Sequence, residues 1–332
     1  MAISIDDIKK LRAMTGAGLA DVKKALTEAE GDFDKAKELL RERGLAIAAK
    51  RSDRETSNGC VLVKSVDGFA AMIALKCETD FVANGADFIA LTQSILDAAI
   101  AAKAKDIEAV KELTLADGQK VQDAVTQRSG ITGEKMELDG YLTLEGENID
   151  IYNHMAKNTL CTMVQTNKPA AEQGHLVAMQ VAAMKPVALN EESVSQATKD
   201  EELKVAIEKT KEEQIARQVN VALKKAGINP AHVDSEDHIE SNTKKGWLTE
   251  EQAAQAREII KTEGEKAAAN LKEQMIQNIA KGRMAKFFKE NCLVDQEFQF
   301  ADGDKISVKD WLKAQDKDLA IVDYKRFTLV AD

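Results

Sequence analysis

The stretch that decides the fold is Lys76-Cys77-Glu78-Thr79-Asp80-Phe81-Val82-Ala83-Asn84. Alternating apolar residues precede it and apolar residues at helical spacing follow it, so it joins a strand to a helix. Thr79 or Asp80 can cap that helix by accepting hydrogen bonds from its free backbone N–H groups. Phe81 is not needed for any cap. Its ring either packs beneath the helix as a hydrophobic staple or projects outward.

Length and charge limit the classes of protein to which this chain can belong. It has 332 residues, of which 44% are hydrophobic and 4% aromatic, enough for a sizeable core and more than one domain. The net charge of −10 argues against a protein that binds nucleic acid nonspecifically through phosphate contacts. No apolar run is long enough to span a bilayer, and no signal sequence is recognisable. We therefore expect a cytoplasmic protein that acts on a protein partner, without direct nucleic-acid or membrane binding.

The cysteines give no sign of a metal or catalytic site. Cys60, Cys77, Cys161 and Cys292 are scattered singly, without histidines at zinc-ligand intervals, so we expect reduced core thiols, no metal and no cofactor. Cys77 could serve as a nucleophile with His154 as its base, but a strand residue beside a turn is more often merely packed. Nucleotide-binding loops and nucleophile elbows are not found either. The sequence therefore assigns no catalytic residue.

Residues 1–50 predict a small three-helix bundle. Ser4 caps the first helix. The second helix spans residues 19–28 and turns an apolar face that includes Leu19 inward. The third ends at Gly44, which is suited to a left-handed C-cap. A bundle of this size resembles the ubiquitin-associated fold, so a ubiquitin-like or nascent-chain-binding module is an alternative for this domain.

After a basic linker at residues 51–59, the pattern predicts two similar α+β subdomains. Asp67-Gly68 between apolar runs signals a β-hairpin in the first subdomain, residues 60–130. A further helix is expected there from Asp106 to Gln127. Strands followed by a helix occur again in residues 131–191, which with residues 289–332 form the second subdomain.

Residues 192–288 differ from the rest because they are rich in Glu, Lys, Gln and Ala and have almost no aromatic residues. Two imperfect apolar stripes predict two helices joined by a tip, an antiparallel coiled-coil hairpin inserted in the second subdomain. Thr249 caps the returning helix. Trp247 near the tip either marks a contact surface or anchors the hairpin. The expected fold class is thus α+β with a helical insertion.

Two separate stretches resemble the signatures of the elongation factor Ts family. Thr79-Asp80-Phe81-Val82-Ala83-Asn84 is similar to one of them, and the run from Leu11 to Leu26 is similar to the other. The similarity covers nearly the whole chain and includes Tyr152-Asn153-His154 and the run from Lys281 to Phe287. The chain stops soon after Phe327-Thr328-Leu329, so we expect the family's C-terminal helical module to be missing.

The resemblance implies a guanine-nucleotide exchange factor for elongation factor Tu, without a catalytic site of its own. In the implied mechanism Asp80 and Phe81, flanked by Thr79 and Val82, push between helices near the magnesium site of the GTPase. This weakens its hold on Mg²⁺ and GDP, so that GTP can load. The resemblance also implies supporting contacts from the bundle, from the loop at residues 131–135 and from His154. The residues are Leu11, Arg12, Gly16, Ala17, Gly18, Lys23, Lys24, Gly133 and His154.

Some alternatives remain open at the level of sequence. His154 reads equally well as an ordinary hydrogen-bonded surface histidine. A homodimer or a heterotetramer with the GTPase is compatible with the resemblance. The alternative function is a non-exchanging adaptor or nascent-chain holdase that uses the bundle and the helical hairpin.

Overall fold

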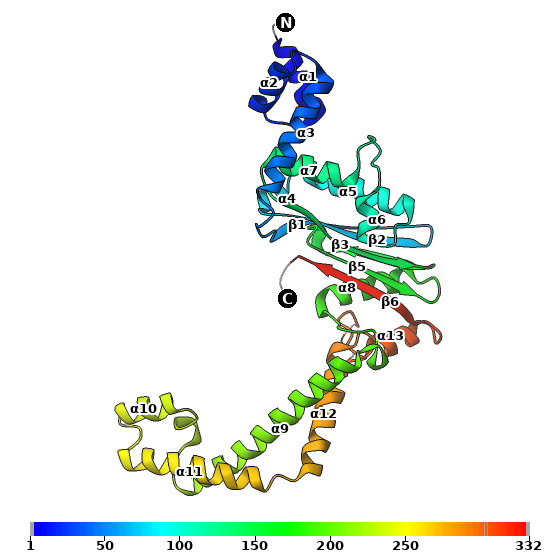
Figure 1. Cartoon of the computed structure of the whole chain (residues 1–332). Helices are drawn as coiled ribbons and strands as arrows, with labels where there is room; N and C mark the ends of the chain where they lie inside the picture. The colour runs from blue at the N-terminus through cyan, green and yellow to red at the C-terminus, as the bar shows by residue number, and fades with distance from the viewer. Residues whose placement is uncertain (1–2, 302, 304, 330–332) are drawn as a thin grey trace. The chain divides into compact units, whose positions relative to one another are not determined.

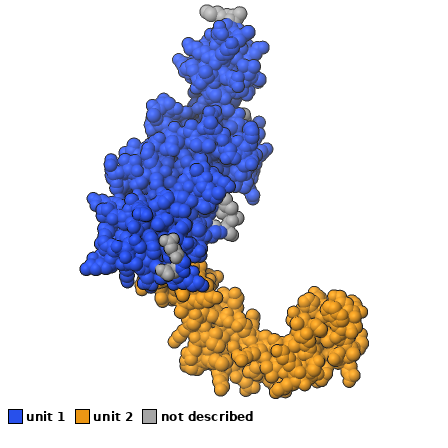
Figure 2. Space-filling view, turned by 180° about the vertical axis from the view of Figure 1, so that it is seen from behind, with its two compact units in different colours: residues 1–189, 297–332 blue, residues 190–296 orange. Residues whose placement is uncertain are grey.

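The computed structural model describes residues 3–301, 303 and 305–329, except for the side chains of residues 47 and 48. The chain divides into two compact units (Figure 2). The first unit comprises residues 1–189 and 297–332, and the second comprises residues 190–296. Helices accompany two small antiparallel sheets, which confirms the α+β class. Within the described residues, no helix combines the length and the apolar character that a membrane span requires.

The N-terminal bundle consists of α1 (Ile5–Thr15), α2 (Leu19–Glu28) and α3 (Phe33–Ala49). Ser4 and Asp7 form a reciprocal capping box at the start of α1, so the predicted cap is confirmed. The bundle core is built on residues with no exposed surface, such as Leu11 and Val22. One inward assignment was wrong, because Leu19 at the first position of α2 is 58% exposed.

Helix α3 does not end at Gly44, as the sequence predicted, but continues to Ala49. Gly44 lies where α3 meets α7 (Val121–Thr132). A Cβ atom at Gly130 of α7 would lie 2.4 Å from the Cα atom of Gly44. The two glycines therefore permit a close approach of two helices, and Gly44 serves this packing rather than termination of α3.

The first sheet has the strand order β1-β2-β3, and all its neighbours are antiparallel. Asp67 and Gly68 have φ angles of 46° and 74°, and they form the predicted tight turn between β1 and β2. The strand that the sequence placed in the second subdomain, β3, pairs with β2 instead. Asp139 is the extra residue of a β-bulge inside β3, because Ala74 pairs with Gly140 and Leu75 with Leu138. The strands are β1 (Asn58–Val66), β2 (Phe69–Cys77) and β3 (Met136–Glu145).

Helices α4 (Asp80–Ala83), α5 (Ala86–Ala102), α6 (Ile107–Lys111) and α7 accompany the first sheet (Figure 1). The expected helix from Asp106 to Gln127 is wrong, because residues 112–120 interrupt it. There the backbone of Thr114 bridges to Lys120, and Gly118 adopts a φ of 86°. Asp117-Gly118 is a turn signal that outweighed helical propensity. The core between helices and sheet includes Phe69 and Phe88.

The second sheet has the antiparallel order β4-β5-β6. The strands are β4 (Ile149–Asn153), β5 (Leu160–Thr166) and β6 (Ile321–Thr328), with the 3₁₀ turn η1 (His154–Ala156) between β4 and β5. Helix α8 (Ala171–Met184) packs on this sheet, and α13 (Val308–Gln315), which the sequence did not predict, precedes β6. Buried residues of both sheets, such as Met72 and Met163, share one cluster, so the sheets pack face to face.

The second unit is a helical hairpin with more elements than the two helices expected. The outgoing arm is α9, and the returning arm is divided into α11 and α12 at residues 270–272. Thr249 forms a capping box at the start of α11, as predicted. Short helices also occur before α9 (η2) and between α9 and α11 (η3 and α10). The bounds are η2 (Glu191–Ser193), α9 (Gln196–Lys225), η3 (Pro230–His232), α10 (Glu236–Lys244), α11 (Glu250–Ala269) and α12 (Glu273–Asn291).

Shortening the hairpin should leave the first unit folded. Glu213 of α9 pairs with Arg283 of α12, so a short Gly/Ser linker can replace residues 214–282. The hairpin has its own apolar cluster around Leu223 and Ala256, and three clusters of the first unit contain residues of that unit alone. By calorimetry, we expect the first unit to melt within about 3 °C of its midpoint in the full chain, a shift equivalent to about 1 kcal/mol. Loss of its cooperative transition would contradict this division.

Candidate functional site

The corner between β2 and α4 presents Phe81 to solvent. The Thr79 hydroxyl accepts a hydrogen bond from the Val82 N–H at 3.3 Å, so Thr79 is the N-cap. Val82 turns toward the core, whereas the Phe81 side chain is 88% exposed. The outward alternative therefore holds, and the staple does not. Asp80 is also exposed, and its carboxylate makes no hydrogen bond or ion pair with any residue that the structure describes.

Two glutamates, Glu78 and Glu134, connect this corner by hydrogen bonds to the segment that follows α7. The Glu134 carboxylate accepts hydrogen bonds from the backbone N–H groups of Glu78 and Thr79, both at 3.1 Å, and from the Thr79 hydroxyl at 2.6 Å. In return, the Glu78 carboxylate accepts from the Lys135 N–H at 2.6 Å. We call this reciprocal arrangement of Glu78 and Glu134 the glutamate brace. It joins the start of α4 to the chain that leaves α7.

Cations of the preceding linker neutralise part of the brace. The Arg54 guanidinium donates to Glu78 at 2.8 Å, and Arg51 lies 3.8 Å from the same carboxylate. The hydrogen bond from the Lys135 N–H, followed by the contacts with Arg54, holds the pKa of Glu78 below its ordinary value. Arg51 and Arg54 thus attach the linker, residues 51–59, to the corner.

Gly133 directs Glu134 toward the corner. It is the C-cap of α7 with a φ of 72°, a left-handed conformation that favours glycine. The Ser129 hydroxyl donates to the Glu134 carbonyl oxygen at 2.6 Å and fixes the residue after the cap. Of the sequence-predicted supporting residues, Gly133 is the one that the structure connects to the Phe81 corner.

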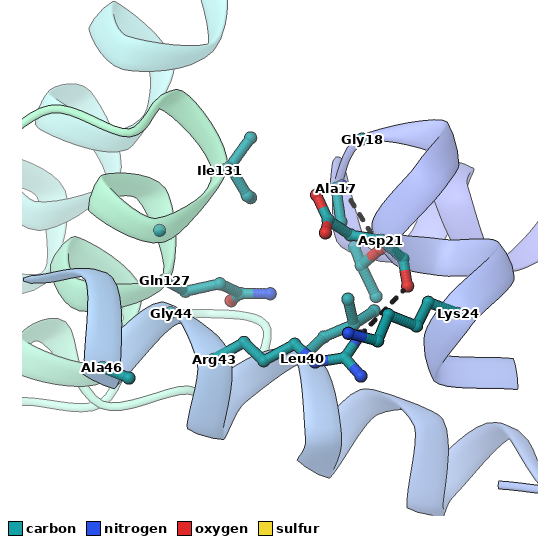
Figure 3. Close-up of a pocket in the computed structure, with 12 residues that line it drawn as sticks. Ala17, Gly18, Asp21, Lys24, Leu40, Arg43, Gly44, Ala46, Gln127 and Ile131 are labelled. Carbon is teal, nitrogen blue, oxygen red and sulfur yellow. Dashed lines mark hydrogen bonds between the residues drawn. The ribbon is translucent and has the colours of Figure 1, made fainter. Parts of the chain in front are cut away.

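The same helix also carries the bundle. Ile131 of α7 packs against the bundle core, and Gly130 contacts Gly44. A pocket of about 290 Å³ lies between the bundle and α7. Figure 3 shows Ala17, Gly18 and Asp21 of the bundle facing Gln127 and Ile131 of α7. The end of α7 therefore contacts the bundle and also leads into the residues that bind the Phe81 corner. The remaining lining residues are Thr15, Lys24, Leu40, Arg43, Gly44, Ala46 and Gly130.

The bundle residues implied by the family signature have unequal access to a partner. Leu11 is completely buried and Ala17 is 7% exposed, so both can act only by shaping the bundle. Gly16 ends α1 with a φ of 67°, and Gly18 is the N-cap of α2. Three cationic side chains are exposed: Arg12, Lys23 and Lys24.

Sequence reasoning missed several residues at or near these surfaces. Met14 is 53% exposed beside the break between α1 and α2, which its apolar character did not suggest. Glu134 and Arg54 are distant from Glu78 in the sequence, and folding brings them into hydrogen-bonding distance of it. A single sequence contains no signal for such contacts, because neither the spacing nor the residue type is distinctive.

His154 lies elsewhere in the first unit, on the connection between β4 and β5. Its Nδ1 is 3.2 Å from the Tyr152 hydroxyl, and the Tyr152 ring also packs edge-on against His175. Next to it, Met155 is 65% exposed with a φ of 52°. His154 is therefore a hydrogen-bonded, half-buried histidine beside an exposed apolar residue.

Cys77 packs behind the corner. Its side chain is fully buried, its Sγ atom donates to the Thr79 carbonyl oxygen at 3.2 Å, and burial raises the pKa of the thiol to about 12. A thiol with this pKa is not a thiolate at neutral pH and is a poor nucleophile. All four cysteines are free and buried, as predicted.

Comparison with known proteins identifies the family. The model of the family Elongation factor TS matches residues 78–220 and 204–331. The chain is 61% identical over 333 residues to Elongation factor Ts of Bacteroides fragilis and 59% identical over 332 residues to that of Phocaeicola vulgatus. It is 40% identical over 333 residues to Elongation factor Ts of Porphyromonas gingivalis, and each comparison covers 100% of both chains. As its two signatures predicted, this chain belongs to the elongation factor Ts family of translation elongation factors.

Proposed function

We propose that this protein binds elongation factor Tu carrying GDP and promotes release of the GDP, so that GTP can load. The observation that carries this proposal is the Phe81 side chain, which is 88% exposed on a corner fixed by a helix cap and by the glutamate brace. A large aromatic side chain held in water contributes little to its own fold. Buried in a partner, the same ring has the character of an interface hot spot.

The chemistry proposed for the corner is mechanical and electrostatic. Phe81 enters between helices near the magnesium site of elongation factor Tu, and Asp80 places a carboxylate beside it. The ring separates the partner's helices, and the site then holds Mg²⁺ and the diphosphate less strongly. No bond is made or broken by this protein, so it acts as an exchange factor and not as an enzyme.

Supporting contacts come from the bundle and from the second sheet. The exposed residues Arg12, Lys23 and Lys24 are suited to direct contact, with the break at Gly16 and Gly18 between them. His154 adds a contact from the β4–β5 connection. We place this activity in the cytoplasm. The full-length matches to elongation factors Ts do not favour the adaptor or holdase alternative.

Reciprocal linkage tests this function. If the protein lowers the affinity of elongation factor Tu for GDP, then GDP must lower the affinity of the protein for elongation factor Tu by the same factor. We expect that factor to exceed roughly tenfold, a coupling of about 1.4 kcal/mol. Calorimetric titrations of nucleotide-free and GDP-bound elongation factor Tu measure one ratio, and GDP titrations with and without the protein measure the other. Equal affinity for both forms would contradict exchange.

A further inference from the structure

The Phe81 corner is held more firmly than a strand-to-helix turn requires. The Thr79 cap alone satisfies the Val82 N–H at the start of α4. The glutamate brace adds three hydrogen bonds to Glu134 and one backbone hydrogen bond to Glu78. These additional interactions hold the backbone N–H groups of Glu78 and Thr79, the two residues before Asp80.

We propose that Glu134 is a positioning residue for nucleotide exchange. It fixes the direction in which the Phe81 side chain projects from the corner. The inference rests on the proposed function of Phe81. Glu134 does not itself need to touch the partner, because it acts through the backbone of Glu78 and Thr79. Its hydrogen bonds are charge-assisted, and such bonds are roughly twice as strong as neutral ones.

The position of Glu134 in the chain adds a second role to the brace. It follows α7 directly after the Gly133 cap, and α7 carries the bundle through Ile131 and Gly130. The end of one helix thereby sets the orientation of both surfaces proposed to contact elongation factor Tu. A change at Glu134 should disturb the Phe81 corner and leave the bundle attached, because the bundle contacts precede the Gly133 cap.

Three variants separate positioning from a general structural effect. Glu134→Ala removes the acceptor, and Glu134→Gln keeps one acceptor oxygen at similar volume. Glu112→Ala is the matched control, because Glu112 is an exposed glutamate that pairs only with Lys120 among the described residues. The measurement is the release rate of labelled GDP from elongation factor Tu against the concentration of each variant.

For Glu134→Ala we expect the maximal release rate to fall roughly fivefold, which corresponds to about 1 kcal/mol in the barrier. The concentration at half-maximal effect should change less than about twofold, because the bundle still docks. Glu134→Gln should give an intermediate rate, and Glu112→Ala should equal the wild type. Hydrogen exchange at the amides of Glu78 and Thr79 should accelerate in Glu134→Ala while the amides of α5 remain protected. Unchanged maximal rates in both Glu134 variants would overturn the proposal.

Combination with Phe81→Ala shows whether Glu134 acts through the ring. Residues that act as a unit are non-additive, so Glu134→Ala should cause little further loss in the Phe81→Ala background. If the two substitutions instead lower the maximal release rate by factors that multiply, Glu134 does not act through Phe81. The positioning proposal would then be overturned, while the proposed function of Phe81 would stand. If Phe81→Ala alone releases GDP at the normal rate, the wedge itself is wrong, and the Glu134 proposal fails with it. If the Glu134→Ala variant does not fold, the double-mutant cycle of Glu134→Gln with Phe81→Ala decides between these outcomes.

Discussion

Replacing Phe81 with alanine should slow the proposed stimulated release of GDP from elongation factor Tu about tenfold or more, equivalent to at least about 1.4 kcal/mol. The side chain is 88% exposed, so its truncation removes little contact from the protein's own fold. In the proposed complex this apolar surface becomes buried in elongation factor Tu, and truncation of an aromatic hot spot costs about 2 kcal/mol or more. Stopped-flow fluorescence of labelled GDP measures the rate, and thermal denaturation should show almost the same midpoint as the wild type.

Phe88→Ala is the control for this variant. Phe88 lies on α5 close to the same corner but is only 2% exposed in the core of the first sheet. Its truncation should cost roughly 3–5 kcal/mol of stability. The Phe88→Ala protein that remains folded should still stimulate GDP release from elongation factor Tu at nearly the wild-type rate. If instead Phe81→Ala were the destabilised variant and its folded fraction exchanged normally, the assignment of Phe81 would be refuted.

The second large effect is expected from Gly130→Ala. The added Cβ atom would lie 2.4 Å from the Cα atom of Gly44, so α3 and α7 must move apart. Overpacking of this kind costs typically about 1–3 kcal/mol. The bundle would shift on α7, so we expect both a lower free energy of unfolding and weaker binding to elongation factor Tu. Denaturant titration and calorimetric binding measure the two effects.

Gly44→Ala is a matched control at the same crossing. A Cβ atom there has its nearest neighbours at 3.7 Å, an ordinary van der Waals distance. Alanine is favoured over glycine inside a helix by about 1 kcal/mol. This variant should therefore be neutral or more stable than the wild type. Greater damage from Gly44→Ala than from Gly130→Ala would contradict the packing described for this crossing.

The features that the sequence predicted correctly depend on local chemistry. Ser4 and Thr249 cap helices through their own side chains, and Asp67-Gly68 forms a turn because of its own backbone preferences. The corner at Thr79 was predictable for the same reason. Such residues need only their immediate neighbours to define a structure.

The errors arose where a distant segment decides the structure. Gly44 has the properties of a helix end, but the approach of Gly130 makes it a packing residue inside α3. Strand β3 follows a loop that suggested a new subdomain, although β2 is its partner. The sequence did not single out Glu134, because its side chain binds Thr79, 55 positions away in the sequence. Only the fold brings these segments together.

The most direct test of the central claim is the release of labelled GDP from elongation factor Tu of the same organism, chased with excess unlabelled GDP. With increasing amounts of the wild-type protein, the release rate constant should rise by far more than tenfold and then saturate, because release proceeds through a ternary complex. A rate constant that stays at its spontaneous value at every concentration, while the two proteins demonstrably form a complex, would contradict the account.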